Sequence, residues 1–122
     1  MIIARLILST NIKEKKDCIK RLILSSDLIR SPAIFIFPRR KFVLFRVTTH
    51  ERWVNEPIVN LLNHLDEKSV SLCPILSDLE IKKTIEIKCS KKYGRVDTSL
   101  ENDTLKRIAK LDASIVYSFF DN

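Results

Sequence analysis

The sequence predicts an α+β domain in which helices pack on one face of a mostly antiparallel sheet. Several segments alternate apolar and polar residues with a period of two, which is typical of strands with one buried face. Other segments repeat apolar residues at helical spacing, which indicates helices with one buried side. Elements of both kinds must cover their apolar sides with each other, and a ferredoxin-like arrangement or a variant of it meets this requirement.

The expected element order is β-α-β-β-α-(β)-β-α-β, where the parenthesis marks an ambiguous segment. In chain order we expect a strand over Ile2–Ser9, a helix from Ile12 to the serines at 25–26, a short strand over Ala33–Phe37, a strand over Lys41–Thr49, a helix from Asn55, the ambiguous segment Val70–Leu76, a strand over Glu80–Ser90, a helix after Thr98–Glu101 and a strand over Ala113–Phe120. Pro74 argues against a central strand in the ambiguous segment. No linker interrupts the series, so we expect one domain over residues 1–122.

The helices carry local signals at their first turns. Asn55 is expected to cap the second helix, and Pro57 falls in the first turn, where a missing N–H costs little. The apolar residues of this helix share one face: Ile58, Leu61, Leu62 and Leu65. Thr98–Glu101 has the spacing of a capping box for the third helix, whose apolar stripe is Leu105, Ile108 and Leu111.

Composition excludes several functional classes. The single glycine excludes the Gly-rich loops that cradle phosphates. Three cysteines without C-x-x-C spacing favour a reducing compartment over a disulfide framework. No apolar stretch is long enough to span a membrane, and the first residues do not form a signal peptide. We therefore expect a cytoplasmic chain with no membrane partner; the pattern carries no signal for a particular oligomeric state.

The chemistry-bearing side chains form no recognisable active site. His50 and His64 lie far apart in the sequence, so a two-histidine metal site is not favoured. Cys89 could pair with either histidine as a nucleophile, but it is in phase with Ile85 and Ile87 and should be buried. We therefore expect no enzyme activity, no metal and no cofactor.

The formal charge of +7, from 22 basic and 15 acidic residues, favours acidic partners such as nucleic acid. Nucleic-acid binding is therefore an alternative function for this chain. Its candidate basic surface consists of Arg39, Arg40, Lys91, Lys92 and Arg95. Nucleic-acid binding on a sheet also needs exposed aromatic side chains. Phe42 and Phe45 flank the basic cluster of Arg39 and Arg40, but these two rings have opposite parity along the strand, so at most one of them faces outward and packing in the core is the favoured role.

The second half carries a pattern of hydrophobic spacing. It consists of Trp53, the helix Ile58–Leu65, the segment Leu76–Leu79 leading into Ile85–Ile87, and the helix-to-strand ending Leu105–Ile115. This stretch resembles a bacterial family of domains of unknown function, family four-two-seven-nine. Asp112-Ala113 stands where the family has glycine, and the first half resembles the family only in its β-α opening. Because domains of this kind look like those found beside bacterial toxin genes, where small proteins serve as immunity partners, the resemblance implies an immunity protein that binds and neutralises a cognate toxin.

A toxin-binding surface on this basic chain calls for a local acidic patch, because many nuclease toxins are basic and complementary charge speeds association. Trp53, the only tryptophan, would be a natural anchor at an interface, but covering the core where the strand passes into the helix is its favoured role. The acidic candidates are Asp66, Glu67, Asp97, Glu101 and Asp103, with Asp78 and Glu80 as further members.

Overall fold

The computed structural model describes residues 1–25, 35–36, 41–90, 92 and 94–120. Its elements in chain order are β1 (Ile2–Ser9), α1 (Lys13–Ser25), β2 (Phe35–Ile36), β3 (Lys41–Thr49), α2 (Asn55–Glu67), α3 (Ser69–Leu76), β4 (Lys82–Ser90), α4 (Asn102–Lys110) and β5 (Ser114–Phe120). Within the described residues the strands form one sheet in the order β2-β3-β1-β4-β5.

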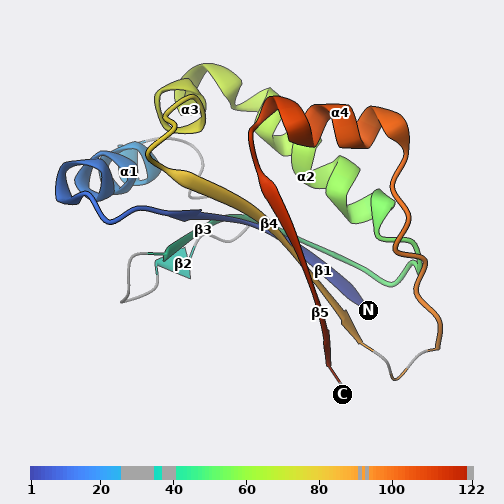
Figure 1. Cartoon of the computed structure of the whole chain (residues 1–122). Coiled ribbons are helices and arrows are strands. Elements are labelled where there is room, and N and C mark those ends of the chain that lie inside the picture. Colours follow the sequence, from blue (N-terminus) through green and yellow to red (C-terminus); the bar gives the residue numbers. More distant parts are fainter. Residues whose placement is uncertain (26–34, 37–40, 91, 93, 121–122) are drawn as a thin grey trace.

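The architecture confirms the expected α+β class. The pairs β2–β3, β3–β1 and β1–β4 are antiparallel, and this order is that of the ferredoxin-like β-α-β-β-α-β unit. The last β-α pair extends the unit, because α4 returns the chain so that β5 lies parallel to β4 at the edge of the sheet. The four helices of the described part of the chain lie on one side of the sheet (Figure 1).

Alternation along the central strands builds the core. Ile2, Ala4, Leu6 and Leu8 of β1 are fully buried under the helices, as are Ile85, Ile87 and Cys89 of β4. The intervening residues face the opposite side of the sheet, where Arg5 pairs with Glu86 across the strands. The predicted pattern of Glu80–Ser90 is therefore confirmed.

A β-bulge places both aromatic residues of β3 in the core. Leu6 lies opposite Phe45, and its neighbour Ile7 lies opposite Val43, so Leu44 is an extra residue in β3. The extra residue reverses the alternation, and Phe42 and Phe45 are 2% and 1% exposed. In a strand without the bulge, Phe42 and Phe45 would point to opposite faces of the sheet, and one of the two rings would lie outside the core.

The ambiguous segment 70–76 forms helix α3 rather than a strand, so the optional β element in the expected order was wrong. Leu72 and Ile75 lie three residues apart and are both fully buried, which fits a helical face and not a strand. Pro74 lies inside this helix. Lys68 ends α2 and begins α3, so the two helices follow each other without a loop.

The joint between α4 and β5 turns at Asp112, whose φ of 54° lies in the left-handed region. Glycine is the usual residue here, but Asp tolerates this conformation better than most side chains. The N–H of Asp112 donates to the carbonyl of Ala109 at 3.0 Å, which closes the last turn of the helix. The chain thus makes without glycine the turn that leads into the edge strand.

Candidate protein-binding interface

Trp53 lies in the connection between β3 and α2 and is half-buried. Its indole Nε1 donates to the carbonyl of Ser99 at 2.9 Å. The neighbouring backbone pairs with Asp97: Val54 N donates to Asp97 O at 3.0 Å, and Asp97 N donates to Arg52 O at 2.6 Å. The tryptophan is therefore held by two chain segments that are more than forty residues apart in the sequence.

Asp97 organises the loop before α4. Its Oδ1 accepts from the Ser99 hydroxyl at 2.6 Å and from the Ser99 backbone N–H at 2.9 Å. These hydrogen bonds, the hydroxyl first, hold the pKa of Asp97 below its ordinary value, so the carboxylate is charged at neutral pH. The expected capping box over Thr98–Glu101 was wrong, because the helix begins only at Asn102 and its cap position is Glu101, whose side chain makes no capping hydrogen bond.

Asn55 joins the starts of two helices. It was expected to cap α2, but the cap position of α2 is Val54, and the Asn55 side chain is directed to α4. Its Oδ1 accepts from the backbone N–H of Glu101, the cap residue of α4, at 3.1 Å. Asn55 is only 4% exposed, so this hydrogen bond lies beneath the surface and fixes the two helix starts side by side.

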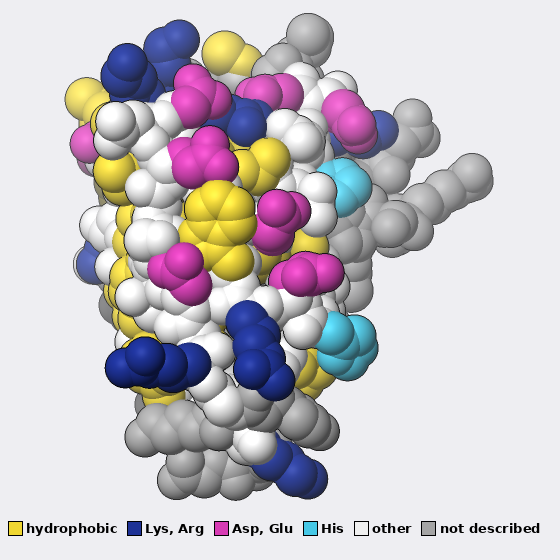
Figure 2. All heavy atoms as spheres, turned by 90° about the vertical axis from the view of Figure 1, so that its right-hand side faces the viewer, with side chains coloured by type: hydrophobic (Ala, Val, Ile, Leu, Met, Phe, Trp, Pro, Cys, Tyr) yellow, Lys and Arg dark blue, Asp and Glu magenta, His cyan; other side chains and the backbone are white. Residues whose placement is uncertain are grey.

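Four exposed acids gather around these two helix starts: Glu56, Asp97, Glu101 and Asp103. We call these four acids and Trp53 the Trp53 surface. Acidic residues stabilise helix N-termini through the helix dipole, which explains Glu56 and Asp103 structurally. Figure 2 shows this side of the molecule, with hydrophobic side chains at the centre, acidic side chains around them and basic side chains above and below.

The structure brings together three of the five acids predicted for the partner surface. Asp97, Glu101 and Asp103 join Trp53, whereas Asp66 and Glu67 lie in the last turn of α2, at the other end of that helix. Arg107 of α4 donates to Asp66 at 2.8 Å, and the imidazole of His64 lies 3.9 Å from Glu67. Sequence reasoning missed Glu56; its signal was its position directly after Asn55 in the first helical turn.

The predicted basic surface is described only in part. Arg39, Arg40 and Lys91 lie outside the described residues. Lys92 and Arg95 are exposed in the segment between β4 and the Trp53 surface, and Arg95 is two residues from Asp97. Phe42 and Phe45 are buried and cannot stack on bases.

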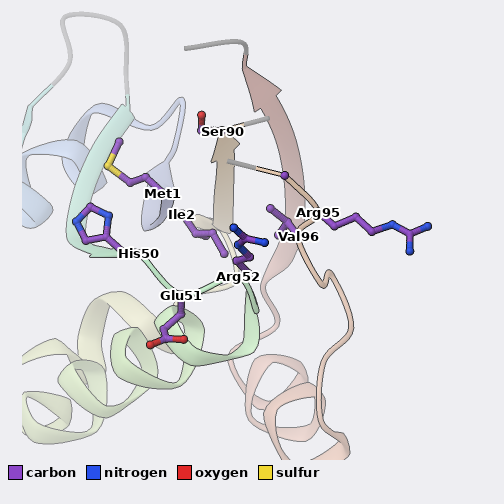
Figure 3. A pocket seen from close by; sticks show the side chains of 9 residues that line it. Met1, Ile2, His50, Glu51, Arg52, Ser90, Arg95 and Val96 are labelled. Atoms are coloured by element: carbon purple, nitrogen blue, oxygen red, sulfur yellow. The ribbon is translucent and has the colours of Figure 1, made fainter. Parts of the chain in front are cut away.

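A pocket of about 200 Å³ is lined by residues that include His50, Glu51, Arg52 and Arg95. Figure 3 shows the His50 ring at the left, the Glu51 side chain turned downward and the Arg95 side chain extending outward to the right. Gly94, with a φ of 93°, allows the turn beside Arg52. The charged groups diverge and do not form an acid–base pair around one reacting atom.

The other candidates for chemistry are placed apart from one another. Cys89 is fully buried, and burial raises the pKa of its thiol, which disfavours the reactive thiolate. The His64 ring stacks on Phe45 with centroids 5.8 Å apart, as part of the packing under α2. Among the described side chains, no three His, Cys, Asp or Glu residues lie close enough together to hold a metal ion.

Comparisons with protein families, curated proteins and solved structures find no match for this chain. In the part of the chain that the structure describes, no helix is both long and apolar enough to cross a lipid bilayer.

Proposed function

We propose that this chain is a non-catalytic protein-binding module, a bacterial immunity protein of the cytoplasm that binds and neutralises a cognate toxin through the Trp53 surface. The observation that carries the proposal is an aromatic side chain fixed at its indole N–H and placed among four exposed carboxylates on a chain of charge +7. A held, half-buried tryptophan is typical of the residues that dominate binding energy in interfaces, because little side-chain freedom is lost on binding.

The charge of the Trp53 surface selects the class of partner. Carboxylates around an apolar centre favour a basic protein surface and would speed its association, as expected for a toxin that acts on nucleic acid. The net positive charge of the whole chain opposes such a partner at long range. Because screening limits charge effects to about 10 Å at ordinary ionic strength, the local acids outweigh the distant lysines at contact.

The test is capture of the partner from the source cell on immobilised protein, after nuclease treatment and at physiological salt. We expect one stoichiometric protein that stops growth when it is expressed alone and is harmless when this chain is co-expressed. Trp53→Ala should lose both capture and protection. The matched control is Asp66→Asn with Glu67→Gln, which removes two acids from the far end of α2 and should retain both.

Nucleic-acid binding by the basic residues is the competing function, and the same experiment separates it. Nucleic acid recovered only without nuclease and lost at high salt would replace the proposed function, because phosphate contacts weaken steeply with salt. In that case Lys92 and Arg95 would be the described residues whose alanine variants lose binding. Trp53→Ala would then bind as well as the wild type.

A further inference from the structure

The last strand leaves one edge unpaired. The sheet order ends at β5, which pairs with β4 on one side, and no strand within the described residues pairs with its other side. Backbone N–H and C=O groups along such an edge are a template for another strand. Within the described residues the opposite edge of the sheet is β2, Phe35–Ile36, so β5 with seven residues is the longer described edge.

β5 lacks the features that usually protect an edge strand. Its sequence, Ser-Ile-Val-Tyr-Ser-Phe-Phe, contains no charged residue and no proline, although 30% of the chain is charged. The three longer strands each carry at least one charged residue. Lysine and proline on an edge normally prevent strand addition. Their absence from β5 points to an edge that is covered by another strand.

Apolar side chains are exposed on both faces of this edge. Tyr117 and Phe119 pair with core residues of β4 and lie on the helix side, where they remain 37% and 49% exposed. Val116 pairs with Glu86, lies on the other side of the sheet and is 47% exposed. β5 lies at the front of Figure 1, and the 90° turn to Figure 2 brings this front to the left margin. A column of hydrophobic side chains runs down that margin in Figure 2.

We propose that β5 pairs antiparallel with β5 of a second copy of this chain and joins the two sheets into one. In a self-paired antiparallel strand, a charged residue lies opposite its own copy at the two-fold axis and diagonally from it next to the axis, and β5 has no charged residue. Two copies of charge +7 repel each other over most of their surface, and an uncharged strand is where contact is least opposed.

The side chains of β5 are compatible with a two-fold axis. With the axis at Tyr117, Ile115 of one copy lies opposite Phe119 of the other, which is a favourable β-branched–aromatic pair. Val116 then lies opposite Ser118 on the other face. The same patch serves both copies, as an isologous dimer requires.

Self-association is separable from toxin binding. β5 contacts the loop that carries Asp97 through the Tyr117 hydroxyl, which donates to the carbonyl of Thr98 at 3.1 Å. Val116 lies on the opposite face of the sheet from the helices and from this contact. A change at Val116 therefore tests the edge without touching Trp53.

The experiment is sedimentation velocity over a wide range of protein concentration, on the wild type and two variants. Wild type should reach twice the mass of one chain, and Val116→Lys should weaken the dimer by about ten-fold or more, because a charge enters the strand pair. The control Leu79→Lys adds the same charge at a side chain that is 80% exposed in the loop before β4, and should dimerise as the wild type does.

Two results would overturn the proposal: a single-chain mass for wild type at every concentration, or a dimer that Val116→Lys leaves unchanged. Circular dichroism checks that the variant is folded, and Ser118→Lys on the same face replaces it if it is not. Amide exchange gives an independent readout. Alternate amides of β5 that point away from β4 should be protected in the wild-type dimer and should exchange quickly in the folded variant.

Discussion

Replacing Asn55 with alanine tests how the fold assembles the Trp53 surface. Asn55 is 4% exposed, and its side-chain oxygen accepts the backbone N–H of Glu101 at 3.1 Å. The substitution removes that acceptor and keeps the good helix propensity of alanine at the start of α2. The direct loss is therefore the bond between the starts of α2 and α4.

The loss in the free energy of unfolding depends on whether the backbone N–H of Glu101 finds another acceptor. Leaving a buried donor unsatisfied costs about 1–3 kcal/mol. Because the Glu101 residue is itself exposed, water can reach part of the freed N–H, and we expect the lower half of that range, about 1–2 kcal/mol. For a domain of this size the midpoint of thermal unfolding should fall by about 3–8 °C.

The assay is urea unfolding, followed by circular dichroism and by the fluorescence of Trp53, which is the only tryptophan. The control is Asn60→Ala, an exposed position of the same helix, which should change the free energy of unfolding by less than about 0.5 kcal/mol. Equal stability of the Asn55 and Asn60 variants would refute the view that Asn55 holds the two helix starts together.

Three further outcomes follow from burial and pairing. Leu61→Ala, at a fully buried position, should lower the free energy of unfolding by about 2–5 kcal/mol, whereas Leu79→Ala, at a side chain 80% exposed, should change it by less than about 0.5 kcal/mol; urea unfolding that ranks them otherwise would contradict the assigned core. The ion pair with Lys15 is the main cause that lowers the pKa of Asp78, so the stability it contributes is present above the ordinary pKa of 3.8 and is lost as pH falls through the lowered pKa. In thermal melts, Asp78→Asn should therefore lose less stability at acid pH than the wild type does. An unchanged dependence of stability on pH would exclude the ion pair as the cause. A thiol reagent should label exposed Cys73 in the native protein and buried Cys89 only on unfolding; equal rates would show that β4 is not covered.

Much of the fold could be predicted because its signals are local. The bounds of β1 and β3 match the predicted strands, and the burial of Ile85, Ile87 and Cys89 follows the alternation. Period-two patterns survive folding when one face of a sheet packs on helices. The parallel placement of β5 could not be predicted in this way, because it depends on where α4 returns the chain.

The errors lie where a residue bonds to a distant segment or where the count of residues changes. The extra residue Leu44 alters strand parity, and nothing local in the sequence marks it. Asn55 had suitable chemistry for its own helix but serves α4, forty-six residues away. Asp66 was grouped with the partner surface by charge, and only the tertiary structure pairs it with Arg107.

The candidate surface was predicted better in its residue types than in its extent. Trp53, Asp97, Glu101 and Asp103 lie around the starts of α2 and α4, because the loop before α4 pairs with the backbone around Trp53. No pattern in the sequence predicts the pairing of this loop with the backbone around Trp53. Charge alone suggested an acidic patch, and long-range hydrogen bonds decide which acids belong to it.

The most direct test is the affinity of the captured partner for wild type and for Trp53→Ala, measured by calorimetry on folded proteins. An anchor residue costs at least about 2 kcal/mol when it is truncated, so the dissociation constant should rise by about 30-fold or more. The double variant Asp66→Asn, Glu67→Gln should bind like the wild type. Equal affinity of wild type and Trp53→Ala would contradict the assignment of the Trp53 surface as the binding site.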